Sequence, residues 1–185
     1  NVLGQKIKMP LFLSPTAMQR LYHHEGDKAS ARAAEKFGTF YSMSTMANSS
    51  IEDIAEVSSG PKLFQLYIHK DQSLTDNLID RCKSSGFNAL CLTVDTVVAG
   101  NREKDHRTGF TTPPKLTLKS LLSFAMHPRW SLNYLTHDKF ELANVSHFTK
   151  KGSSIAKGVM EYINEQYDPA MSWKDAEYVV KKWGG

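Results

Sequence analysis

Four short apolar runs, separated by segments with helical spacing, constrain the fold of this chain more than any other feature. The runs are Leu11–Leu13, Thr39–Met43, Leu63–Ile68 and Ala89–Val94. Between the runs, apolar side chains recur three or four positions apart, as they do on one face of an α-helix. Gly38 and Gly86 stand where two of these helices would end before the next strand. The pattern predicts an α/β fold in which parallel strands follow one another in chain order.

Polar residues end or follow each predicted strand. They are Ser14, Pro15 and Thr16, then Ser42 and Ser44, then Gln65 and Tyr67, and finally Thr93 and Asp95. The carboxyl ends of parallel strands meet at one edge of a sheet, and a (β/α)8 barrel carries its active site at that edge. Ordinary turn chemistry at strand ends is the alternative explanation. It fits Asp95 least well, because a carboxylate at the end of an apolar strand requires a partner.

The strand–helix pattern stops after Asp95, and residues 96–150 form a long insertion. Within it, residues 101–150 contain eight Lys and Arg against four Asp and Glu, which accounts for the whole net charge of +4. Large apolar side chains accompany these charges: Leu121, Leu122, Phe124, Trp130, Tyr134 and Phe140. Helical spacing returns over Ile155–Ile163 and Ser172–Trp183, where Ser172 and Asp175 fit a variant of the capping box.

Composition places the chain among globular proteins, with 41% hydrophobic and 23% charged residues. No apolar run approaches the ~20 residues that span a bilayer, and no signal-peptide pattern begins the chain. Cys82 and Cys91 lack the spacing of a disulfide framework or a zinc site, so we expect two buried thiols, no metal and a cytoplasmic location. His23-His24 lacks ligand spacing too and predicts an exposed turn. Because it lacks an initial methionine, the chain is expected to be a piece of a longer protein.

Four motifs occur in order along the chain: Pro15-Thr16-Ala17-Met18-Gln19, Phe64-Gln65-Leu66-Tyr67, Leu92-Thr93-Val94-Asp95 and Gly100-x-Arg102-Glu103-x-Asp105. Together they resemble the FMN-dependent 2-hydroxy-acid oxidase and dehydrogenase family, which includes glycolate oxidase, L-lactate dehydrogenase and mandelate dehydrogenase. The resemblance extends over essentially the whole chain. His127-Pro128-Arg129-Trp130-Ser131 and Ser172-Trp173-Lys174-Asp175 are similar to the dehydrogenases in particular, foremost the membrane-associated L-lactate dehydrogenases.

The resemblance implies a TIM (β/α)8 barrel, of which this chain holds about the first four βα units and the long loop after the fourth strand. Residues 1–185 would then be the N-terminal half of an FMN-binding barrel, with an insertion loop at about 96–150. The family's base histidine, its neighbouring arginine, the lysine beside the flavin and the phosphate site have no counterpart in these 185 residues. A catalytically inactive fragment is therefore the rival interpretation of this polypeptide.

The resemblance also assigns cofactor-binding residues. The backbone of Pro15, Thr16 and Ala17 is expected to pass along the flavin ring, and the side chains of Ser44, Gln65 and Thr93 are expected to hydrogen-bond its heteroatoms. A few fixed polar contacts of this kind orient a flavin and tune its electronics.

Three further residues receive roles in substrate binding and catalysis from the same resemblance. Tyr67 is expected to offer its phenol to the substrate's hydroxyl or carboxylate, and Arg102 to bring a permanent cation to that carboxylate. Asp95 is expected to pair with the catalytic histidine and to stabilise its protonated form. Tyr67 and Asp95 are thus the expected catalytic residues.

The implied function is FMN-dependent oxidation of an L-2-hydroxy acid, foremost L-lactate, to the 2-oxo acid, with electrons passed to a quinone-like acceptor. Mandelate dehydrogenase and the oxygen-using glycolate or lactate oxidases are the alternatives within the family. The implied partners are a small 2-hydroxy acid, a quinone and further copies in a homotetramer, with no nucleic acid.

The basic and aromatic insertion also suits an anionic membrane surface. We therefore predict that residues 115–150 attach the protein peripherally to the inner face of the cell membrane. A loop folded over the barrel mouth, or a subunit contact, is the alternative use of this segment.

Overall fold

The computed structural model describes residues 1–95, 103–108, 117–137, 140–146, 168 and 170–184. In these ranges four strands form one parallel sheet in the order β1-β2-β3-β4. The strands are β1 (Phe12–Leu13), β2 (Phe40–Ser44), β3 (Lys62–Leu66) and β4 (Ala89–Leu92). All three neighbouring pairs are parallel, which confirms the predicted pairing in chain order.

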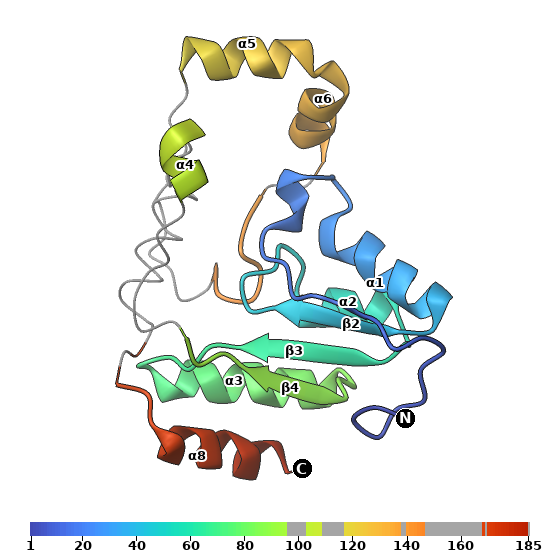
Figure 1. Ribbon diagram of the computed structural model, residues 1–185, viewed down its shortest axis with the longest axis vertical. Coiled ribbons are helices and arrows are strands. Elements are labelled where there is room, and N and C mark those ends of the chain that lie inside the picture. Colours follow the sequence, from blue (N-terminus) through green and yellow to red (C-terminus); the bar gives the residue numbers. More distant parts are fainter. Residues whose placement is uncertain (96–102, 109–116, 138–139, 147–167, 169, 185) are drawn as a thin grey trace.

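A helix follows each of the first three strands. These helices are α1 (Gly26–Phe37), α2 (Ile51–Val57) and α3 (Gln72–Ser84), and a short 3-10 turn, η1 (Gln19–Leu21), precedes α1. Figure 1 shows α3 alongside β3 and β4, with α8 (Trp173–Trp183) next to α3. The Tyr178 hydroxyl donates to Asp76 (2.7 Å) and Lys182 pairs with Asp80 (2.9 Å). These contacts place α8 where the helix of a fourth βα unit belongs.

Local capping signals set the ends of these helices. Ser50 and Asp53 form a capping box at the start of α2, and Ser172 and Asp175 form the predicted one at the start of α8. Gly38 ends α1 with left-handed backbone (φ 68°), which costs glycine little because it has no Cβ. The capping residues recognised in the sequence therefore mark the ends of helices in the structure.

Each predicted strand boundary lies within two residues of the observed one, and β1, β3 and β4 are shorter than predicted. β4 ends at Leu92 rather than Val94, although the Thr93 N–H still donates to the Leu66 carbonyl (3.0 Å). Among the described strands only β3 flanks β4, so its side chains are less covered than those of β2 and β3. Cys91 is exposed there, which corrects the expectation of two buried thiols.

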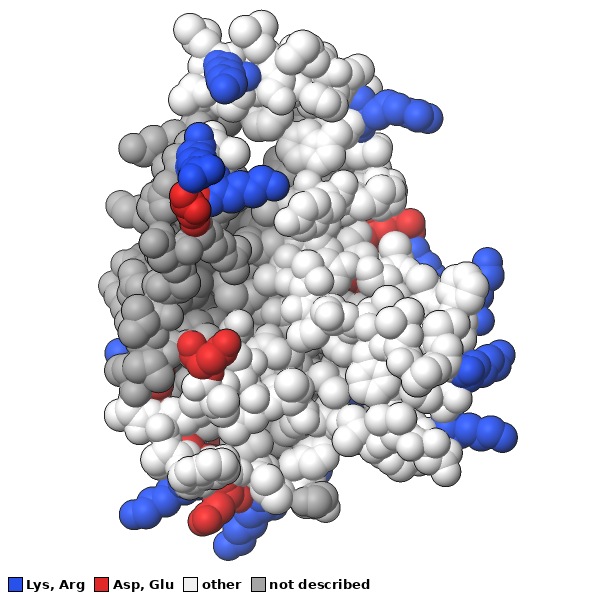
Figure 2. Space-filling view, viewed as in Figure 1, with Lys and Arg blue, Asp and Glu red and all other residues white. Residues whose placement is uncertain are grey.

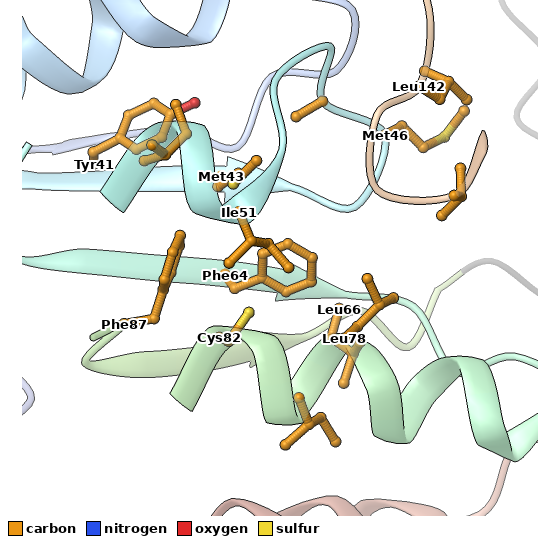
Figure 3. Close-up of a cluster of buried hydrophobic side chains, with 14 of the residues drawn as sticks. Tyr41, Met43, Met46, Ile51, Phe64, Leu66, Leu78, Cys82, Phe87 and Leu142 are labelled. Atoms are coloured by element: carbon orange, nitrogen blue, oxygen red, sulfur yellow. The ribbon is translucent and has the colours of Figure 1, made fainter. Parts of the chain in front are cut away.

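The core lies between the sheet and its helices, as Figure 3 shows. Its most enclosed side chains, none more than 1% exposed, include Tyr41, Met43, Phe64 and Leu66 from the strands and Ile51, Leu78 and Cys82 from the helices. Burial raises the pKa of the Cys82 thiol far above its usual range, so this cysteine stays protonated and unreactive. Met46 and Leu142 lie side by side in Figure 3 and extend the core towards residues 140–146.

The insertion contains three described helices that stand apart from the sheet. They are α4 (Glu103–Thr108), α5 (Leu118–Met126) and α6 (Pro128–Thr136). Figure 1 shows α5 across the top of the view and α6 turning down from its end towards η1, so the two helices form a bent hairpin rather than an antiparallel one. None of the described helices is long and apolar enough to cross a membrane. The expected helical segment Ile155–Ile163 lies outside the described residues.

Residues 140–146 of the insertion are bonded to the loop between β2 and α2 through two buried asparagines. Asn144 accepts a hydrogen bond from the Ile51 N–H (3.0 Å) and donates one to the Ser49 carbonyl (3.1 Å). Asn48 donates to the Glu141 carbonyl (2.7 Å). The loop between β2 and α2 is therefore the anchor to which the end of this segment is fixed.

Candidate active site

Three of the residues expected to contact the cofactor form one hydrogen-bonded row across the carboxyl ends of β2, β3 and β4. The Ser44 hydroxyl donates to the Gln65 amide oxygen (3.3 Å), and the Gln65 amide nitrogen donates to the Thr93 hydroxyl (2.5 Å). The parallel register pairs Ser44 with Gln65 and places Thr93 one residue beyond the Leu66–Leu92 pair. Sheet pairing therefore brings together side chains that are far apart in the sequence.

The backbone behind this row is held by the turn after β2. The Thr45 N–H and hydroxyl both bond the Gln65 carbonyl, at 3.1 and 2.6 Å, and the Met46 N–H donates to the Ser44 hydroxyl (3.1 Å). Ser44 and Gln65 are buried, at 3% and 5% exposure, while Thr93 is half-buried. Because the row is fixed from behind, its free edge is preorganised for a ligand.

The donor set of the row fits the FMN ring. With Gln65 bonded as it is, its amide nitrogen has a second N–H, and the Thr93 hydroxyl, which accepts from Gln65, retains its own proton to donate. An isoalloxazine presents carbonyl oxygens and ring nitrogens that accept such hydrogen bonds. Ser44 and Gln65 meet at the β2–β3 register, so the row lies at the edge where a barrel carries its chemistry.

The segment after β1 runs beside the row. The Met18 N–H donates to the Met46 carbonyl (3.2 Å), and Met18 adopts left-handed backbone (φ 54°). Ala17 packs against the core, whereas Pro15 and Thr16 are exposed. Since Met46 lies two residues after Ser44, this contact brings the expected flavin-lining backbone next to the row.

Tyr67 follows β3, half-buried and packed against the core. His69, two residues later, is only 3% exposed, and its backbone N–H bonds the Thr75 hydroxyl on α3 (3.1 Å). Burial lowers the pKa of His69 to about 4, so its ring is neutral at physiological pH. His69 therefore ties the loop that carries Tyr67 to the start of α3, a role that no pattern in the sequence indicated.

Of the remaining expected site residues, the structure describes Asp95 but not Arg102. Asp95 is exposed in the structure and lies three residues beyond the end of β4. Arg102 lies outside the described residues, and the expected pairing of these two with substrate and histidine stays a prediction.

A buried carboxylate that the sequence analysis missed supports the site from the side of α1. Asp27 is fully buried and accepts from the Tyr41 hydroxyl (3.1 Å) and from the N–H groups of Asn48 (2.9 Å) and Ser49 (3.3 Å). Burial raises the pKa of Asp27, and the three donors act against that rise. Asp27 thus fixes the β2–α2 loop, which anchors residues 140–146.

Comparison with known proteins places the chain in a family. The model of the family described as FMN-dependent dehydrogenase matches residues 1–185. An L-lactate oxidase from Nostoc is 40% identical over 183 residues, covering 97% of this chain and 44% of the oxidase. A glycolate oxidase from Spinacia oleracea is 38% identical over 179 residues, covering 97% of this chain and 42% of the oxidase. The chain therefore spans less than half the length of these curated relatives.

Solved structures agree with the sequence matches. A structure described as the monotopic membrane protein (S)-mandelate dehydrogenase superposes with a TM-score of 0.88 at 33% identity, covering 99% of this chain and 48% of that one. With this match, the four parallel strands in chain order and their outer helices are the first four βα units of a (β/α)8 barrel. The chain belongs to the FMN-dependent dehydrogenase family.

Proposed function

We propose that the full-length protein containing this chain binds FMN at the carboxyl ends of β2–β4 and oxidises an L-2-hydroxy acid, foremost L-lactate, to the 2-oxo acid. The observation that carries this proposal is the row formed by Ser44, Gln65 and Thr93. It is supported by relatives whose names specify lactate and glycolate as substrates. A mandelate-type substrate is the second candidate, because the superposed dehydrogenase acts on (S)-mandelate.

The residues of this chain divide the work between binding and proton handling. When bound, FMN supplies the two-electron acceptor. Gln65, Thr93 and Ser44 orient it, and Tyr67 offers its phenol to the substrate. Asp95 holds a histidine that lies elsewhere in the intact protein and stabilises its charged form as the substrate loses its proton. Because these 185 residues lack that histidine's motif, we expect no turnover from the chain alone.

The cofactor part of the proposal is tested by Thr93→Val in the full-length protein. The substitution removes the hydroxyl that accepts from Gln65 and that is expected to face the flavin. We expect the Kd for FMN, measured by quenching of flavin fluorescence, to rise about 3- to 10-fold for one lost hydrogen bond. Thr136→Val, on the exposed surface of α6, is the matched control. Equal Kd values for the two variants would contradict the assignment.

The catalytic part is tested with Asp95→Asn and Tyr67→Phe, with ferricyanide as the electron acceptor. Asp95→Asn should lower kcat for L-lactate strongly while FMN content stays at the wild-type level, because only the charge beside the base is lost. Tyr67→Phe should cost less, about 0.5–1.5 kcal/mol in transition-state binding, because it deletes one hydrogen bond. Parallel loss of FMN and activity in Asp95→Asn would assign Asp95 a structural role instead.

The hairpin of α5 and α6 supports the further proposal that the protein lies on the inner face of the cell membrane. Six apolar side chains are more than half exposed: Leu118 (81%), Leu121 (51%), Leu122 (64%), Met126 (72%), Leu132 (61%) and Leu135 (78%). Lys119 and Arg129 are the only charged residues in 117–137, and Figure 2 shows basic side chains among uncharged atoms at this end of the molecule. Such a surface suits an anionic, partly apolar interface.

The structure changes how this proposal is tested. Deleting residues 115–150 would also remove Leu142, Asn144 and Val145, which are buried, and would unfold the anchor of the segment. A double variant, Leu118→Ser with Leu122→Ser, alters only the exposed face of α5. We expect it to lose co-sedimentation with vesicles containing anionic phospholipid, while Phe37→Ser, at an exposed position on α1, retains it. Wild-type protein that stays unbound at every salt concentration would favour a cover over the barrel mouth or a subunit contact.

A further inference from the structure

The side chain of Asn48 joins two segments that lie far apart in the sequence. Its amide oxygen accepts a hydrogen bond from the Arg20 N–H (3.1 Å), and its amide nitrogen donates to the Glu141 carbonyl (2.7 Å). Only this orientation of the amide sets a donor against an acceptor at both ends, because the flipped amide would set NH₂ against N–H and oxygen against oxygen. Asn48 is 7% exposed, so water is poorly placed to replace either bond.

The bond to Arg20 supplies a cap that η1 lacks in its own sequence. The first N–H groups of a helical turn have no carbonyl partner within the turn, and a polar side chain just before the turn usually accepts from one of them. Met18 precedes η1 and makes no side-chain cap bond. Asn48 accepts from Arg20, the second residue of the turn, and therefore caps η1 from the loop between β2 and α2.

This cap lies next to a residue with costly backbone geometry. Met18 has a φ of 54°, a left-handed conformation that is unfavourable for a residue with a Cβ, so neighbouring interactions must hold it there. The structure provides one bond at Met18, whose N–H donates to the Met46 carbonyl (3.2 Å), and one two residues later, from Arg20 to Asn48. Met18 directly follows residues 15–17, the backbone expected to line the flavin. The course of that backbone therefore depends on the bond to Asn48.

The other end of the Asn48 amide lies against the insertion. Its partner, the Glu141 carbonyl, belongs to residues 140–146, which pack into the core. A second bond joins the insertion to η1, because the Trp130 indole N–H donates to the Leu21 carbonyl (2.9 Å). The insertion is thus bonded to η1 twice, once through Asn48 and once through Trp130.

We propose that Asn48 is a positioning residue for the cofactor: it fixes the backbone expected to line the flavin and couples that backbone to the insertion. The inference rests on the proposed function, because it takes FMN to bind beside residues 15–17. A displacement of residues 140–146 that broke the bond to Glu141 would leave the amide free to turn, and the bond to Arg20 would weaken with it. Because such coupling is reciprocal, bound FMN should in turn restrict residues 140–146.

The test compares two buried asparagines in the full-length protein. Asn48→Leu removes both bonds and should raise the Kd for FMN about 10-fold, the equivalent of ~1.4 kcal/mol. It should also change the visible circular dichroism of the bound flavin. The matched control is Asn144→Leu, because Asn144 is also buried and its bonds go to Ile51, Ser49 and Arg81 rather than to η1.

The control separates a positioning role from a merely structural one. Asn144→Leu should lower the melting temperature about as much as Asn48→Leu does, because each variant loses bonds between the insertion and the β2–α2 loop. It should nevertheless leave the Kd for FMN within about twofold of wild type and the flavin spectrum unchanged. Equal changes of Kd in the two variants would overturn the proposal and make Asn48 a structural anchor only.

A milder substitution keeps the test decisive if Asn48→Leu fails to fold. Trp130→Phe retains an aromatic ring in the stack on α6 but loses the N–H that bonds Leu21. It should raise the Kd for FMN about threefold. Trp173→Phe, at an 87% exposed position on α8, is its control and should leave the Kd unchanged. An unchanged Kd in Trp130→Phe would contradict the coupling of the insertion to the flavin site.

Hydrogen exchange without FMN separates this inference from the proposed function. In the FMN-free, full-length protein, amide exchange of residues 16–21, followed by mass spectrometry, should be faster in Asn48→Leu than in wild type and unchanged in Asn144→Leu. If the wild type binds no FMN but this difference appears, the proposed function is wrong and the link from Asn48 to η1 stands. If FMN binds and both variants keep the wild-type Kd, the proposed function stands and Asn48 is not a positioning residue.

Discussion

The sheet with its helices and the α5–α6 hairpin are both rich in leucine and aromatic residues, yet the apolar side chains are buried in the first region and largely exposed in the second. On α3, Leu74 and Leu78 are fully buried against the sheet, whereas Leu122 and Leu135 of the hairpin are largely exposed. The segments α3, α5 and α6 are all helices, so their local backbone structure is the same. The difference is that α3 has a strand surface to cover, and the hairpin has none among the described residues.

The polar residues of the two regions differ in the same manner. Around the sheet, Asp27, Asn48 and Asn144 are buried and bonded to backbone groups of distant segments. On the hairpin, the cap formed by Thr117 and Ser120 is local and exposed. The sheet is thus held by interactions between segments far apart in the sequence, whereas the hairpin is held by interactions between residues close in the sequence, apart from the bond of Trp130 to η1.

The sharpest test of this comparison is to remove one leucine from each region. Leu78→Ala should lower the free energy of unfolding by about 2–5 kcal/mol, because it leaves a cavity under the sheet. Leu122→Ala should change it by no more than about 0.5 kcal/mol, because that side chain is 64% exposed. Urea titrations of the full-length protein measure both. A large loss in Leu122→Ala would show that another part of the protein covers the hairpin.

Because His69 is buried, it should make the free energy of unfolding depend on pH. Its pKa is about 4 in the folded chain against 6.5 for the free side chain, so the unfolded chain binds more protons between these values. The free energy of unfolding should therefore fall as the pH drops from 6.5 towards 4, and the loss due to His69 should approach about 3 kcal/mol. In thermal melts across this window, His69→Gln should flatten the pH dependence. The control is His127→Gln, on the hairpin, and an effect as large as that of His69→Gln would contradict the assignment.

A smaller effect is expected from the buried carboxylate of α1. Asp27→Asn replaces an acceptor of three hydrogen bonds with an amide whose NH₂ group faces backbone N–H donors, at a cost of about 1–3 kcal/mol. Asp80→Asn removes an exposed ion pair with Lys182 and should cost at most about 1 kcal/mol. Chemical denaturation measures both values. Equal losses would mean that Asp27 does not anchor the β2–α2 loop.

Local sequence patterns were sufficient to predict the strands and helices of the barrel. Alternating strands and helices, the turn at Gly38 and the capping box of Ser172 and Asp175 each depend on residues close together in the sequence. The resemblance named Ser44, Gln65 and Thr93 as residues of one site, and the structure brings them together. Strand ends were less well predicted, because the end of β4 depends on which neighbours cover it.

Interactions between distant segments were decided only by the tertiary structure. Nothing near Asn144 in the sequence indicates that it bonds the start of α2, and nothing near Trp130 indicates that it bonds the Leu21 carbonyl. Leucines and aromatic residues of the insertion were expected to meet a membrane together, but the Trp130 indole bonds the Leu21 carbonyl on η1, while Leu122 and Leu135 are exposed. The order of the βα units could be predicted from the sequence, because helical spacing and helix caps depend on residues only a few positions apart. The burial of Asp27 and the bond of Trp130 to η1 required the folded chain, because desolvation and hydrogen bonding there depend on groups that only folding brings near.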